Sequence, residues 1–125
     1  MARIRSMGAW TLCLAVSLSA QESTLTCEVV DDGVEQIKCT FATPRKNETR
    51  EISFYWHSDM HPQDDRERNI VLPANHGSVY DYRYLRGRAQ GAWTVTVTLT
   101  DTDGREHEVV HAFMLEDDHI VSEAR

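Results

Sequence analysis

The chain has 125 residues, and its 13 Lys and Arg residues against 20 Asp and Glu residues give a formal net charge of −7. An acidic chain repels phosphate backbones and anionic lipid surfaces, which argues against a nucleic acid or such a membrane as partner. The length suits one domain with one core rather than two.

The first twenty residues have the layout of a secretory signal peptide. Arg3 and Arg5 precede a mostly apolar run, Ala9 to Val16, and small residues follow it. This run is shorter than the roughly 20 residues of a membrane span. We therefore predict that residues 1–20 are removed on export, that the protein is secreted or periplasmic, and that it does not insert in a membrane afterwards. Losing the two arginines changes the net charge from −7 to −9.

Two cysteines remain after the leader, Cys27 and Cys39, in a chain bound for an oxidising compartment where disulfides persist. The stretch LTCEVVDDGVEQIKCTF has two strand-like arms around a turn at Gly33. The cysteines face each other when the turn is centred on this glycine. The spacing thus predicts a disulfide that joins the two arms of the first hairpin.

A charged loop, Thr43 to Thr49, comes next and carries an N-glycosylation triplet at Asn47, which a eukaryotic secretory pathway would be needed to use. The following stretch, EISFYWHS, alternates large apolar residues with more polar ones and predicts a strand with one buried face. Residues 59–69 are predicted to form a polar loop, and IVLPA, residues 70–74, a further strand.

The loop after EISFYWHS is a candidate metal site. The stretch YWHSDMHPQDD brings imidazole, carboxylate and thioether groups close together, the donor types that copper and zinc take. The candidate ligands are His57, Asp59, Met60 and His61. The alternative interpretation is a plain solvated loop.

The strand SVYDYRYL places three tyrosines on one face, with an arginine next in line. We favour the interpretation that these rings form a core layer and that Asp81 and Arg83 mark the solvated side. The alternative is an exposed strip that stacks on a glycan or contacts a protein. Its candidate partner-binding residues are Tyr80, Tyr82, Tyr84 and Arg86.

The stretch HEVVH, residues 107–111, matches the H-E-x-x-H motif of zinc proteases, which requires a helix. Its context predicts a strand instead, because WTVTVTLT precedes it and Asp103-Gly104 is a strong hairpin turn. A two-residue turn there points His107 and His111 away from the core, among threonines. A metalloprotease that uses His107, Glu108 and His111 is therefore the least favoured function.

About seven strand-like segments predict a small antiparallel β-sandwich with immunoglobulin-like layers over residues 21–116, followed by a polar tail, residues 117–125. A small barrel is the alternative. The immunoglobulin pattern itself is not met, because both cysteines lie in the first hairpin.

The order FYWHSDM, IVLPA, VYDYRYLRGRAQGAWTVTVTLTDTDGRE and HAFML resembles a small bacterial extracytoplasmic domain of unknown function, over roughly residues 52–115. That domain often follows transmembrane helices, whereas this chain carries a leader and a cystine hairpin. The resemblance implies an all-β module without known catalysis.

We therefore expect an exported, non-catalytic binding or accessory module of the cell envelope, with an unidentified protein or glycan as partner and no cofactor. The alternative is a periplasmic copper- or zinc-binding protein that uses the His57 loop.

Overall fold

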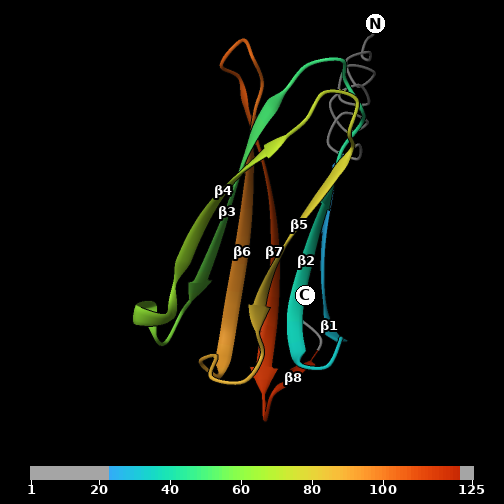
Figure 1. The fold of residues 1–125 in the computed structure, drawn as a ribbon. Coiled ribbons are helices and arrows are strands. Elements are labelled where there is room, and N and C mark those ends of the chain that lie inside the picture. Colours follow the sequence, from blue (N-terminus) through green and yellow to red (C-terminus); the bar gives the residue numbers. More distant parts are fainter. Residues whose placement is uncertain (1–22, 122–125) are drawn as a thin grey trace, which may run out of the picture.

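The computed structural model describes residues 23–121 and shows an all-β protein with two antiparallel sheets (Figure 1). The predicted signal peptide, residues 1–20, and residues 122–125 of the predicted tail lie outside the described part. Within residues 23–121, no helix is long and apolar enough to cross a membrane. The strands are β1 (Thr24–Asp31), β2 (Glu35–Ala42), β3 (Arg50–Ser58), β4 (Arg66–Leu72), β5 (Ser78–Tyr84), β6 (Gly91–Thr100), β7 (Glu106–Glu116) and β8 (His119–Val121).

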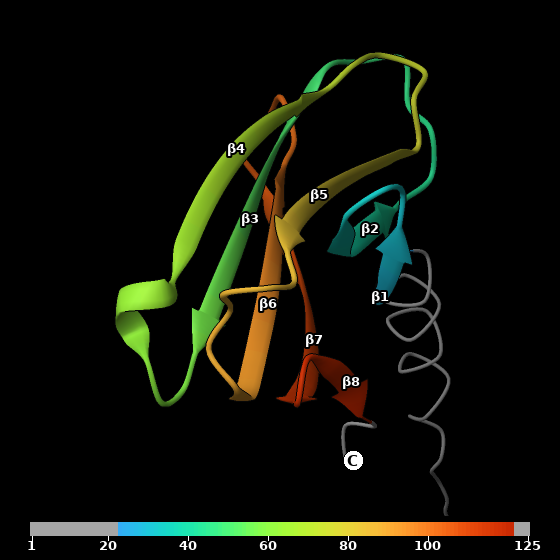
Figure 2. The same ribbon diagram turned by 60° about the horizontal axis from the view of Figure 1, so that its bottom comes forward.

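The two sheets pack face to face as a sandwich (Figure 2), as the strand pattern predicts. One sheet has the order β1-β2-β5, and the other has the order β4-β3-β6-β7-β8. The chain crosses between the sheets after β2, after β4 and after β5. These crossings place β5, the edge strand of the small sheet, beside β4, the edge strand of the large one.

The core follows the predicted alternation in the two central strands of the large sheet. Every second residue of β3 and β6 is buried, and the threonines and polar residues between them face outward. Burial of such side chains supplies about 1.5–3 kcal/mol each. The buried apolar residues of these strands are Ile52, Phe54, Trp56, Trp93, Val95, Val97 and Leu99.

The disulfide predicted for the first hairpin is present. Cys27 lies directly opposite Cys39 across β1 and β2, and the two are bonded. The Cys39 side chain is fully buried, and Cys27 packs against the core. The bridge therefore lies on the inner face of the small sheet.

The sandwich has eight strands because part of the predicted tail is ordered. Residues His119–Val121 form β8 and pair with the end of β7, and Ile120 packs against the core. β1 contacts both β7 and β8. The first strand of the small sheet thus packs against the last two strands of the large sheet along this side of the sandwich.

The β6–β7 register differs from the prediction by one residue. The turn is a three-residue loop, closed by the N–H of Asp101 donating to Arg105 O at 2.9 Å, and Gly104 has a φ of +89°. One extra loop residue moves every side chain of the returning strand to the other face. His107 therefore pairs with Leu99 and His111 with Val95, on the inner face of β7, so the predicted outward direction of both histidines is wrong. His107 lies near the end of the sandwich, and its side chain is still 54% exposed.

The predicted polar loop, residues 59–69, is also too long. β4 begins at Arg66 rather than at Ile70 and pairs with β3 from its first residue. Because Arg66 lies opposite the buried Trp56, it shares the inner face, and Arg68 follows two residues later. Two arginines thus point toward the small sheet.

Removing the disulfide is expected to lower the free energy of unfolding by about 2–3 kcal/mol, because the closed loop is short. Urea denaturation of a Cys27→Ser/Cys39→Ser double variant, followed by tryptophan fluorescence, measures this loss. The wild-type protein under reducing conditions is the control and should match the variant. Equal midpoints for the oxidised protein and the variant would contradict the prediction.

Candidate functional site

The tyrosines of β5 face solvent rather than the core. Tyr80 is 50% exposed and Tyr84 is 62% exposed, whereas Asp81 is 1% exposed. The favoured interpretation, with the rings in the core and Asp81 and Arg83 solvated, is therefore wrong. The three rings lie on the outer face of the small sheet.

Register explains this orientation. Asp81 lies directly opposite Cys39 in the neighbouring strand, and Arg83 lies opposite Ile37. Residues directly opposite each other share a face, so the buried cystine fixes Asp81 on the inside. The residues between them, including Tyr82, then face outward.

Polar side chains of β2 lie beside the rings. The Nζ of Lys38 is 4.5 Å from the centre of the Tyr80 ring and 5.8 Å from that of Tyr82, and the two rings meet edge to face at 5.1 Å. We call this surface the tyrosine face. It comprises Tyr80, Tyr82 and Tyr84 of β5 with their neighbours Gln36, Lys38 and Thr40 of β2.

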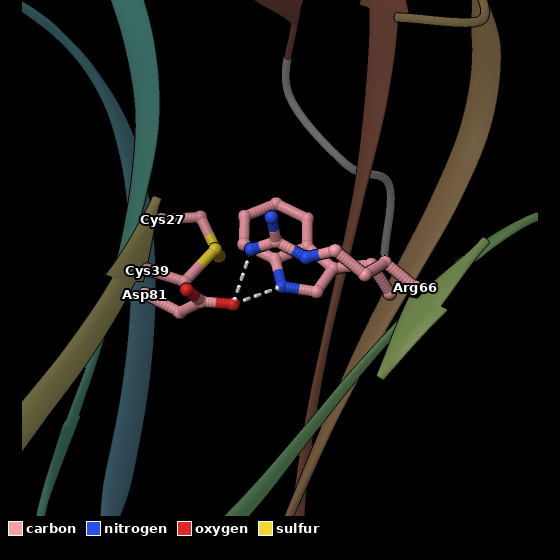
Figure 3. Close-up of a disulfide and its surroundings, with 5 residues drawn as sticks. Cys27, Cys39, Arg66 and Asp81 are labelled. Carbon is pink, nitrogen blue, oxygen red and sulfur yellow. Dashed lines mark hydrogen bonds and ion pairs between the residues drawn. A yellow bond between two sulfur atoms is a disulfide. The ribbon is translucent and has the colours of Figure 1, made fainter. Parts of the chain in front are cut away.

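A buried carboxylate joins the two sheets beneath this face. Asp81 Oδ2 accepts hydrogen bonds from Trp56 Nε1 at 2.9 Å and from Arg66 Nη2 at 2.7 Å. Figure 3 shows Arg66 reaching Asp81 beside the disulfide. The same Nη2 donates to the carbonyl of Tyr82 at 2.9 Å, and Arg68 Nη1 lies 3.5 Å from the other carboxylate oxygen.

A second ion pair continues the cluster. Arg83 donates to the carbonyl and to the carboxylate of Asp64 at 2.8 and 3.1 Å, and its guanidinium lies over the Trp56 and Trp93 rings at 5.8 and 5.7 Å. Burial lowers the pKa of Arg83, and the nearby Arg88 lowers it further, while Asp64 acts in the opposite direction. Arg83 still stays charged, because the ordinary pKa of a guanidinium lies far above neutral pH.

Two surface hollows flank Tyr84. One, which we call the arginine hollow, has a volume of about 310 Å³ and is lined by Gln36, Arg66, Tyr82, Arg83, Tyr84 and Arg88. The other lies against the β1–β2 turn, and both Tyr84 and Arg86 line it. Three of the four predicted partner-binding residues, Tyr82, Tyr84 and Arg86, thus line two openings at the end of β5, and Tyr80 lies outside both.

The structure brings together only part of the predicted metal site. His57 Nε2 lies 3.7 Å from Asp59 Oδ1, while Met60 is 69% exposed and His61 lines a different hollow with Gln63. Among the described residues, no group of three or more His, Cys, Asp or Glu side chains is placed to hold a metal ion.

The other side of the His57 ring is occupied. Its Nδ1 lies 2.8 Å from Asp65 Oδ2, which also accepts a hydrogen bond from the Tyr55 hydroxyl, and Asp65 Oδ1 accepts one from the Ser58 N–H. Burial by itself would raise the pKa of Asp65, but the bonds from His57, Ser58 and Tyr55 lower it below the usual value. The pKa of Tyr55 is raised, mainly because its hydroxyl donates a hydrogen bond to the Asp65 carboxylate.

The HEVVH pentapeptide lies within β7, so the predicted strand is confirmed. Residues four apart on a strand are separated by about 13 Å, too far for both imidazoles to bind one zinc ion. The helical arrangement of a zinc protease is thus not formed by His107 and His111.

No family model matches the chain, and no curated protein or solved structure is similar enough to count as a match.

The arginines are the site residues that sequence reasoning missed. The run DDRER supplied a signal, because Arg66 and Arg68 alternate at the start of a strand and their charge is opposite to that of Asp81. Assigned to a loop, the run has no defined face. The alternation places Arg66 and Arg68 on the inner face only once β4 is paired with β3.

Asp81→Asn is expected to lower the free energy of unfolding by roughly 1–3 kcal/mol, because Arg66 loses its ionic partner while the amide oxygen still accepts from Trp56. Arg68→Gln is the control and should cost less than about 1 kcal/mol, since that contact is longer and more exposed. Urea denaturation measures both. A smaller loss of unfolding free energy for Asp81→Asn than for Arg68→Gln would contradict this prediction.

The lowered pKa of Asp65 predicts a pH dependence. Its folded-state pKa lies below the unfolded value of about 3.9, so its stabilising contribution is full above that value and is lost as the pH falls through the folded-state pKa. The difference in unfolding free energy between wild type and Asp65→Asn should therefore shrink as the pH falls below about 4. Urea titrations from neutral to acidic pH measure it, and a difference that stays constant over this range would contradict the prediction.

Proposed function

We propose that the protein is an exported, non-catalytic module that binds a glycan of the cell envelope through the tyrosine face. The observation that carries this proposal is the exposure of the Tyr80 and Tyr84 rings on the outer face of the small sheet. Large aromatic rings usually lie in the core of a small sandwich, so a row of exposed ones marks an interaction surface.

The chemistry of the face suits a sugar polymer. The Tyr80 and Tyr82 rings meet edge to face with their centres 5.1 Å apart, and Tyr84 lies four residues, about 13 Å, from Tyr80 along the strand. The exposed rings of Tyr80 and Tyr84 offer apolar surfaces on which the C–H faces of sugar rings stack. Tyrosine hydroxyls, Lys38, Gln36 and Thr40 lie beside these rings and supply hydrogen-bonding groups for sugar hydroxyls. The centre of a protein interface is depleted of charged residues, whereas here Lys38 lies among the rings.

The disulfide supports export. Cystines persist in oxidising compartments such as the periplasm and the extracellular space, and the Cys27–Cys39 bond closes the hairpin next to β5. The leader-like residues 1–20 and the resemblance to an extracytoplasmic bacterial domain point to the same compartment.

Binding of the oxidised protein to insoluble peptidoglycan sacculi, chitin and cellulose tests this function in a sedimentation assay. Tyr84→Ala should weaken binding to the recognised polymer at least about tenfold, because the most exposed ring of the tyrosine face is lost. Tyr55→Ala is a matched control, since Tyr55 is an exposed tyrosine on the outer face of the other sheet. Retention on none of the three polymers, or an equal loss in both variants, would refute the proposal.

A further inference from the structure

Positive charge is concentrated at the end of β5 in an otherwise acidic protein. The ion-pair cluster between β4 and β5 contains four arginines and two aspartates, which leaves an excess of two positive charges. The arginines are Arg66, Arg68, Arg83 and Arg88. The chain as a whole carries a net charge of −7, so this excess is local.

The two aspartates do not use all the guanidinium N–H groups. Asp64 already accepts from Arg83 and from the N–H of Ala89, and its contact with Arg88 Nε is long, at 3.5 Å. The Nε atoms of Arg66, Arg83 and Arg88 are buried without a hydrogen-bond partner. Protein atoms cover these Nε groups, so the donors open to a ligand are the terminal Nη groups. Arg88 Nη2 makes only a long contact, 3.5 Å, to the Gly87 carbonyl, and the Arg88 side chain is 21% exposed.

Three of the four arginines line one opening. The side chains of Arg66, Arg83 and Arg88 border the arginine hollow together with Gln36, and the lining contains no Asp or Glu. Guanidinium groups present paired N–H donors that match the two oxygens of a carboxylate. The volume of about 310 Å³ is at the small end of ligand sites and suits a single ring or group rather than an extended chain.

The hollow is continuous with the tyrosine face. Tyr82 and Tyr84 belong to both, so a polymer stacked on the rings runs past the arginines. We propose that the arginine hollow binds the carboxylate of an acidic sugar unit within a largely neutral glycan, which rests on the proposed glycan-binding function. One carboxylate is favoured over a dense polyanion, because the remaining acidic surface repels a highly charged polymer.

Calorimetric titration of the oxidised protein with two forms of one polymer tests this assignment. Partly methyl-esterified polygalacturonan carries isolated free carboxylates, and the fully esterified polymer carries none. The partly esterified form should bind about tenfold or more tightly, and Arg88→Gln should remove most of that difference while leaving affinity for the neutral form unchanged. Thermal denaturation checks that Arg88→Gln folds. If it does not, Arg88→Lys takes its place: this variant keeps the charge but lacks the paired donors, so it should also lose most of the preference for the partly esterified polymer.

Arg105→Gln is the matched charge control. Its side chain is 76% exposed in the β6–β7 turn, so a loss of binding equal to that of Arg88→Gln would show general attraction and overturn the site. Displacement of the polymer by millimolar inorganic phosphate would overturn a carboxylate-specific site. Binding of neither polymer would also overturn it. Equal affinity for both polymers, with Tyr84→Ala still weakening each, would overturn the carboxylate site but leave the glycan-binding function standing.

Discussion

The buried Asp81 carboxylate connects the two sheets and determines what the surface above it presents. It receives the Trp56 indole N–H from the centre of the large sheet and the Arg66 guanidinium from the edge of that sheet. A carboxylate removed from water is unfavourable without such donors. Because Asp81 must face inward to reach them, its neighbours Tyr80 and Tyr82 face outward.

The same constraint shapes the side of the sandwich between β4 and β5. An edge strand exposes backbone groups that promote unwanted pairing with other chains. Here Arg66 donates to the Tyr82 carbonyl on the free edge of β5, and charged side chains from β4 lie along the gap. An arrangement that protects the edge thus also gathers the guanidinium groups that surround the arginine hollow.

The two outer faces of the molecule differ in chemistry. The small sheet carries aromatic rings with Lys38 among them and the exposed Glu28 directly opposite it, whereas the large sheet carries threonines of β6 flanked by acidic residues such as Glu51 and Glu106. For the proposed ligand, a glycan with an acidic unit, the carboxylates of Glu51 and Glu106 make the outer face of the large sheet the less favourable one. The two faces differ because side chains alternate in direction along each strand, and because the order of the strands decides which side chains lie next to one another.

The sequence by itself determined the features that depend on local periodicity. Alternation in β3 and β6 identified their buried faces, and the spacing of Cys27 and Cys39 around one turn identified the disulfide. The tyrosine strand was ambiguous, because both of its faces carry side chains that a core or a surface can accept. Its orientation depends on partners distant in sequence, namely Trp56 and Arg66 for Asp81, and only tertiary packing brings these together. The His107 and His111 positions were likewise decided by one extra loop residue, since the backbone hydrogen bonds that close the turn override the pattern of apolar residues.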